Sequence, residues 1–207
     1  MFPSITRTGA FVSEIRDQIN NQFATLQGNS FVGGTTQTLN TDGNLNVQIS
    51  SAGVSPGATG ADNVVAVFSI PAGAFSAAGK MVSIIANGSF AGNGDTKTVK
   101  IIFNPATAVV GSTVGTGGTT IASTGAVATN GGGWQLSAAV TKYGAAGSNT
   151  QLGVNLQNQS GAAADVLLAP AAITATESGN ILVAVTANCA TTATDVVLSM
   201  LQVRFAN

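Results

Sequence analysis

The chain has 207 residues, of which only 7% are charged, and its formal net charge at pH 7 is −1. Ordinary globular domains carry about 25% charged residues, and a nucleic-acid-binding protein needs a basic stripe that displaces counterions from phosphate. The 7 Lys and Arg residues are scattered and form no such stripe. We therefore expect no nucleic-acid partner. The lack of a basic amphipathic segment and of a run of about 20 apolar residues predicts no membrane partner either.

The same composition indicates a rigid β protein with much of its surface covered by neighbours. Hydrophobic residues make up 44% of the chain, which excludes a disordered protein. A large surface with few charges and near-zero net charge tends to associate. The alternative interpretation is an uncharged β-sandwich that remains a monomer.

Residues 1–34 predict an N-terminal arm and one short α-helix that serve attachment or oligomerisation. The apolar residues between 11 and 26 follow the spacing of one helical stripe, and Gly28 stands where a C-terminal cap belongs. Such a helix is marginal alone in water, so its stripe packs either on its own domain or on a partner. The candidate anchor residues are Phe2 and Ile5 in the arm and Phe11, Val12, Ile15, Ile19, Phe23 and Leu26 in the helix.

Residues 35–207 predict one β domain. Short apolar or alternating runs are separated by turn residues at a spacing of about 10 residues, which is typical of a sandwich or barrel. Asp42-Gly43 predicts a hairpin turn. We expect about nine or ten strands, with clear runs at residues 45–49, 63–70, 80–90, 96–103, 134–141, 151–157, 165–170, 171–176, 180–188 and 195–205.

The stretch NGSFAGNGDTKTVKIIFN, residues 87–104, concentrates Asp95, Lys97 and Lys100 in a chain with little charge. A calcium site needs several oxygen ligands at loop spacing, and one carboxylate beside one Asn does not supply them. The glycine-rich turn between two β runs instead predicts a hairpin with solvated charges.

Alternation along the strands also predicts the positions of single residues. Trp134 falls on the inward side of its strand, and Tyr143 at a strand end is the better candidate for an exposed contact. Cys189 has no cationic neighbour and is expected to be a buried, unreactive thiol. In the predicted strand at residues 151–157, the apolar alternation of Leu152, Val154 and Leu156 indicates the buried face.

Catalytic motifs are lacking. Without a histidine the chain cannot build a Ser-His-Asp or Cys-His arrangement, and the eight acidic residues are isolated in sequence. We expect no metal, no cofactor and no enzymatic activity. A carbohydrate-active enzyme, the weakest alternative, would need folding to bring two carboxylates to about 5–10 Å from each other.

The segments FSIPAGAFSAAGKMVSIIANGSFAGNGDTKTVKIIFN and NILVAVTANCATTATDVVLSMLQVRF resemble domains of tailed-bacteriophage virion proteins over residues 63–205. In those domains an IPAG turn precedes a strand, followed by a G-x-F-x-x-N hairpin and a K-T-V-K-I/L strand. The resemblance implies an antiparallel, jelly-roll-like β-sandwich, often trimeric, that is located in the virion after assembly in the host cytoplasm. It supplies no catalytic motif.

Two functions follow as expectations. The first is a capsid decoration, or cement, protein that binds as a homo-oligomer, a trimer by the resemblance, across major capsid subunits and stabilises the shell. Its N-terminal arm and helix would attach it to the major capsid protein or another virion protein. The alternative is a head or tail fibre whose charge-free loops between Phe103 and Trp134 contact host glycans.

Overall fold

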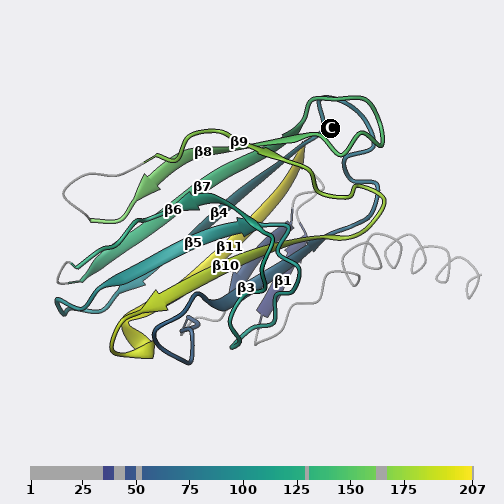
Figure 1. The fold of residues 1–207 in the computed structure, drawn as a ribbon. Coiled ribbons are helices and arrows are strands. Elements are labelled where there is room, and N and C mark those ends of the chain that lie inside the picture. Colours follow the sequence, from purple (N-terminus) through teal and green to yellow (C-terminus); the bar gives the residue numbers. More distant parts are fainter. Residues whose placement is uncertain (1–34, 40–44, 50–52, 129–130, 162–166, 207) are drawn as a thin grey trace, which may run out of the picture.

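The computed structural model describes residues 35–39, 45–49, 53–128, 131–161 and 167–206. These residues form two antiparallel β-sheets that pack face to face (Figure 1). The strands are β1 (Thr35–Leu39), β2 (Leu45–Ile49), β3 (Asn63–Ile70), β4 (Met81–Phe90), β5 (Lys97–Phe103), β6 (Thr119–Ser123), β7 (Gly132–Lys142), β8 (Gln151–Gln159), β9 (Ala171–Ile173), β10 (Ile181–Cys189) and β11 (Val196–Ala206). A short 3-10 helix, Ala193–Asp195, precedes β11.

The strand order is that of a jelly roll. One sheet has the order β1-β2-β11-β4-β7-β8-β9 and the other β3-β10-β5-β6. Successive strands from β2 to β5 alternate between the sheets, so β2-β11-β4-β7 faces β3-β10-β5-β6 as two Greek keys. Strand β1 extends one edge of the larger sheet, and β8 and β9 extend the other. The predicted fold class, a mainly β, antiparallel, jelly-roll-like sandwich, is confirmed.

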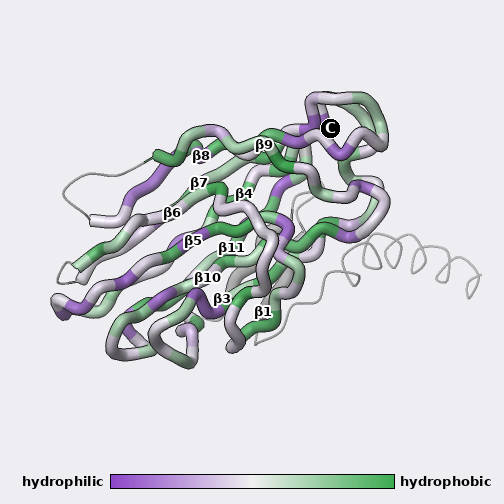
Figure 2. Tube along the Cα trace, viewed as in Figure 1, coloured by the Kyte–Doolittle hydropathy of each residue, from purple (hydrophilic) through white to green (hydrophobic). Residues whose placement is uncertain are grey.

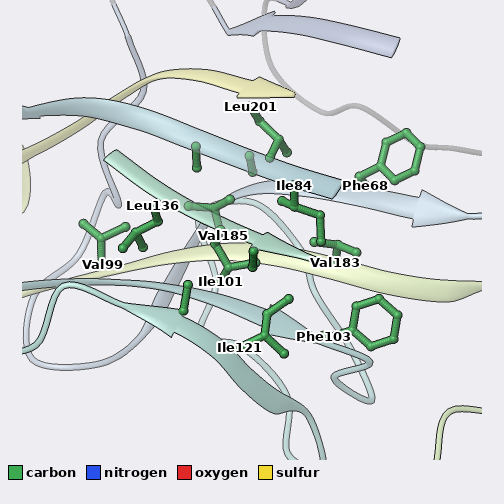
Figure 3. Close-up of a cluster of buried hydrophobic side chains, with 14 of the residues drawn as sticks. Phe68, Ile84, Val99, Ile101, Phe103, Ile121, Leu136, Val183, Val185 and Leu201 are labelled. Atoms are coloured by element: carbon green, nitrogen blue, oxygen red, sulfur yellow. The ribbon is translucent and has the colours of Figure 1, made fainter. Parts of the chain in front are cut away.

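The core lies between the sheets and consists of aliphatic and aromatic side chains. Figure 3 shows Ile84, Leu136 and Leu201 of the larger sheet meeting Ile101 and Val185 of the smaller one. The rings of Phe75 and Phe103 make an edge-to-face contact with centroids 6.2 Å apart. In Figure 2 hydrophobic segments run along both sheets, and strongly hydrophilic segments are short. The alternating strands therefore bury their apolar sides against one another.

The hairpin predicted for residues 87–104 is wrong. Strand β4 pairs with β11 and β7, whereas β5 pairs with β10 and β6, so the connection between β4 and β5 crosses from one sheet to the other. The reason is that both strands alternate and turn their apolar sides toward the same core from opposite sheets. The glycine-rich turn marks a reversal of the chain but does not determine whether the strands pair.

Lys97 is not a solvated charge, because its side chain is fully buried at the end of this connection. Its Nζ donates hydrogen bonds to Asn93 O at 2.8 Å, Asn93 Oδ1 at 2.6 Å and Asp95 O at 2.9 Å. Asn93 Nδ2 in turn donates to Asp195 Oδ1 at 2.8 Å. Lys100 behaves as predicted and forms a partly exposed ion pair with Asp62.

The other predicted strands agree with the structure apart from their ends, with the exception of the run 165–170. Strand β3 occupies the predicted residues 63–70. Strands β1 and β2 pair antiparallel up to Leu39 and Leu45, which confirms a hairpin here. The turn predicted at Asp42-Gly43 lies within residues 40–44, outside the described part. Residues 167–170 of the predicted run 165–170 are not in a strand.

Candidate interaction surfaces

The predicted anchor residues lie outside the described part of the chain, and their role stays a prediction. These residues are Phe2, Ile5, Phe11, Val12, Ile15, Ile19, Phe23 and Leu26. The candidate surfaces below are therefore those of the sandwich itself. They belong to the outer face of the larger sheet, the outer face of the smaller sheet, and the loops at one end.

The orientation predicted for β8 is reversed. Gln151, Gly153 and Asn155 point inward and are buried, whereas Leu152 and Val154 are half-buried on the outer side and the bulged Leu156 is 52% exposed. The inward polar residues have partners, because Asn155 Nδ2 donates to Ser137 O at 3.0 Å and Asn155 Oδ1 accepts from Leu168 N at 3.1 Å.

Gly153 helps to determine this orientation. A Cβ added to it would lie 2.6 Å from Ile121 Cγ2 and 3.0 Å from Ile173 Cδ1, so a side chain has no room there. Gly153 fits this close approach only if it points inward. Gln151 and Asn155, which lie on the same side of the strand, then also point inward and form their buried hydrogen bonds. As a consequence, β8 presents its aliphatic side chains outward.

The outer face of the larger sheet is almost free of charge. By register and alternation, the described positions on this face of β11, β4, β7, β8 and β9 include one charged residue, Arg204. The others are apolar, small or neutral polar: Val197, Met200, Gln202, Met81, Ser83, Ile85, Asn87, Ser89, Gly133, Gln135, Ser137, Ala139, Thr141, Leu152, Val154, Leu156, Gln157, Gln159 and Ala172. Because burying a charge costs much more free energy than burying an apolar or hydrogen-bonded neutral group, another protein can cover such a face at little cost.

A hollow of about 400 Å³ opens on this face, and amide side chains line it. Asn87, Gln135 and Gln159 stand opposite one another in register across β4, β7 and β8. Gly133 and Gly161 leave the space open. Amides both donate and accept hydrogen bonds, so this arrangement suits a neutral polar ligand that carries hydroxyl groups.

The outer face of the smaller sheet is covered by residues 104–118. Val64, Val67 and Ala184 form a second buried apolar cluster beneath this segment. Backbone hydrogen bonds hold the segment in place, including Val64 N to Ser112 O and Gly111 N to Val64 O, both at 2.9 Å. The charge-free loops expected at the tip of a fibre are therefore, in this part, a cover packed on the sandwich.

Loops at one end of the sandwich are joined by a buried ion pair. Lys142 and Glu177 are both buried, and Lys142 Nζ lies 2.5 Å from Glu177 Oε1. Lys142 Nζ also donates to Ser148 Oγ and Thr150 Oγ1. Burial raises the pKa of Glu177, but hydrogen bonds from Lys142 and Gln151 and the charge of Lys142 outweigh this, so the pKa is below its ordinary value. Sequence spacing gave no sign of this pair, which lies 35 residues apart.

Three single-residue predictions can be checked at these sites. Trp134 is buried, and Tyr143, next to Lys142, is 59% exposed, as predicted. Cys189 is buried as predicted, and burial raises the pKa of its thiol.

In the described residues, no cluster of three or more His, Cys, Asp or Glu side chains is arranged to hold a metal ion. No helix in the described part has the length and apolarity to cross a membrane.

Comparisons with protein-family models, curated proteins and solved structures found no match to this chain.

Proposed function

We propose that the chain is a virion structural protein of a tailed bacteriophage, a capsid decoration protein that binds across major capsid subunits and stabilises the shell. The observation that carries this proposal is the outer face of the larger sheet, where β8 turns Leu152, Val154 and Leu156 outward and Arg204 is the charged residue among the described strand positions. A face with so little charge loses little hydration free energy when another protein covers it.

The mechanism is mass action. A protein that binds the assembled shell and not its free subunits shifts the equilibrium toward the shell. Burial of apolar surface contributes about 25 cal/mol per Å², less the entropy lost on association. The low charge favours association over a free monomer. It is therefore compatible with a homo-oligomer that stays bound to capsid subunits.

The jelly-roll strand order supports the proposal by analogy. Jelly rolls occur in viral capsid and lectin domains, but a fold alone does not specify a function. The predicted anchors, Phe2, Ile5 and the apolar stripe of residues 11–26, would supply attachment or trimerisation. In this proposal the N-terminal segment attaches the protein, and the sandwich covers the capsid surface.

The experiment is a binding assay with purified capsids from the phage that encodes the chain. We expect the full-length protein to sediment with capsids and to raise the temperature at which they break. Deletion of residues 1–28 should abolish sedimentation with capsids and leave the shells fragile. Failure of the full-length chain to bind capsids would reject the decoration role.

One observation favours a second candidate, a fibre that contacts host glycans. The amide-lined hollow of Asn87, Gln135 and Gln159 offers hydrogen-bonding groups to sugar hydroxyls on an open face of the sandwich. In that case the soluble protein should block phage adsorption to cells, and filling the hollow with Gly133→Gln should remove the block. Shell strength should then be independent of the protein.

A further inference from the structure

Lys142 and Gln151 stand directly opposite each other in the β7–β8 ladder. Residues opposite each other in an antiparallel pair project to the same face, with Cβ atoms about 4.5–5.5 Å apart. Here that face is the interior, and both side chains are fully buried. The structure therefore holds a primary amine and a carboxamide in one enclosed space.

Glu177 joins the two groups through a single oxygen atom. Its Oε1 accepts a hydrogen bond from Lys142 Nζ at 2.5 Å and another from Gln151 Nε2 at 2.5 Å. Its second oxygen, Oε2, is buried, and the backbone N–H of Gly147 also contributes a hydrogen bond to the carboxylate. A carboxylate placed between an amine and an amide nitrogen can carry a proton from one to the other.

The carboxamide of Gln151 is held in a fixed orientation by Ala175. The backbone N–H of Ala175 donates to Gln151 Oε1 at 2.9 Å, and Gln151 Nε2 donates to Ala175 O at 3.1 Å. The N–H of Ala175 thus points at the oxygen that would gain negative charge if a nucleophile added to Cδ. A preorganised donor in that position stabilises a tetrahedral intermediate.

We propose that Lys142 and Gln151 join in an intramolecular isopeptide bond, with Glu177 transferring the proton. The Glu177 carboxylate takes a proton from the Lys142 ammonium, and the neutral Nζ adds to Gln151 Cδ. The Cδ–Nε2 bond then breaks as Glu177 returns a proton to Nε2, and ammonia leaves. One amide replaces another, so no oxidant or reductant is consumed, and the departing ammonia carries away the proton released by the amine.

Burial and proximity favour this reaction. Fixed geometry lowers the entropic part of the barrier. Exclusion of water leaves hydrolysis without a nucleophile. The Ser148 and Thr150 hydroxyls, which accept hydrogen bonds from Lys142 Nζ at 2.8 Å and 3.2 Å, keep the amine at this end of the strand. The proposal is independent of the virion role.

The test is the intact mass of the purified full-length chain. We expect a mass about 17 Da below that of the sequence, which corresponds to one ammonia. Trypsin should fail to cleave after Lys142, and fragmentation should locate the link between Lys142 and Gln151. A wild-type protein with the full sequence mass would overturn the proposal.

Two variants separate this reaction from other losses of ammonia. Asn-Gly pairs such as Asn87-Gly88 and Asn93-Gly94 can lose ammonia by forming a succinimide. Lys142→Arg keeps the positive charge, Glu177→Gln keeps the length of the side chain, and both variants should show the full mass. A loss that persists in Lys142→Arg would assign it to an asparagine, and a link that forms in Glu177→Gln would remove Glu177 from the reaction; either result contradicts the proposal.

Discussion

The ammonium group of Lys97 lies 2.6 Å from the side-chain oxygen of Asn93, and the two residues close the connection between β4 in one sheet and β5 in the other. The same Nζ contacts two backbone carbonyls of that connection. The buried lysine therefore occupies the position that a bound cation has in many loops, because its Nζ donates hydrogen bonds to three oxygen atoms that point toward it.

Replacement of Lys97 by Met should therefore destabilise the sandwich. The substitution removes three hydrogen bonds and leaves the carbonyl oxygens of Asn93 and Asp95 without this donor, whereas Asn93 Oδ1 keeps the bond from Asp95 N. We expect the free energy of unfolding to fall by about 3 kcal/mol. Lys100→Met, on the same strand, is the matched control. It removes a partly exposed ion pair with Asp62 and should cost about 0.2–1 kcal/mol. Equal losses in chemical denaturation would contradict the role of Lys97.

Gly88 should not tolerate a side chain. A Cβ at this position would lie 1.8 Å from Val197 O and 2.8 Å from Trp134 Cζ2. We expect Gly88→Ala to lower the unfolding free energy by about 2 kcal/mol or more, because backbone and indole both have to move. Gly133→Ala is the control on the neighbouring strand, since its Cβ would lie no closer than 3.7 Å to Gly88 O. Thermal unfolding of the two variants tests the difference.

Cys189 should be unreactive in the folded protein. Burial raises the pKa of its thiol, as does the neighbouring carboxylate of Asp195, so the reactive thiolate is scarce at pH 8. We expect a thiol-specific disulfide reagent to react roughly 100-fold more slowly with native protein than with protein in denaturant. Comparable rates in the two conditions would show that the thiol is accessible.

The outward leucine of β8 should matter for association and not for folding. Leu156→Ser removes an exposed apolar side chain, so we expect the unfolding free energy to change by no more than about 0.5 kcal/mol. Self-association, measured by light scattering, should weaken. Leu136→Ala, in the core, should instead cost about 2–5 kcal/mol. A large loss of stability in Leu156→Ser would place this residue in the core after all.

The sequence predicted most strands because alternation and turn residues are local signals. Strand β3 matches its predicted bounds, and Trp134 is buried as its position indicated. Which strands pair was harder to predict. The same glycine-rich turn sequence can connect β4 and β5 as a hairpin or as two strands that lie in different sheets. The jelly-roll order depends on which strands meet across more than 100 residues, as β2 and β11 do.

The orientation of β8 and the buried ions could not be predicted from alternation alone. Hydrophobicity assigns Leu152 and Val154 to the core, but Gln151 and Asn155 are inside because backbone groups of Ala175, Ser137 and Leu168 satisfy them. Those partners are distant in sequence. Lys142 and Glu177 are likewise 35 residues apart in sequence and meet only in the folded protein. Tertiary contacts, and not local sequence patterns, therefore determine the structure of this end of the molecule.

A cryo-electron microscopy reconstruction of intact particles from the bacteriophage to which the proposal assigns the chain tests the central claim most directly. Our account predicts jelly-roll density on the outside of the shell that touches more than one capsid subunit, with the larger sheet or the N-terminal segment in contact with another protein. Particles without this chain, together with an isolated chain that stays monomeric and does not bind capsids, would contradict it.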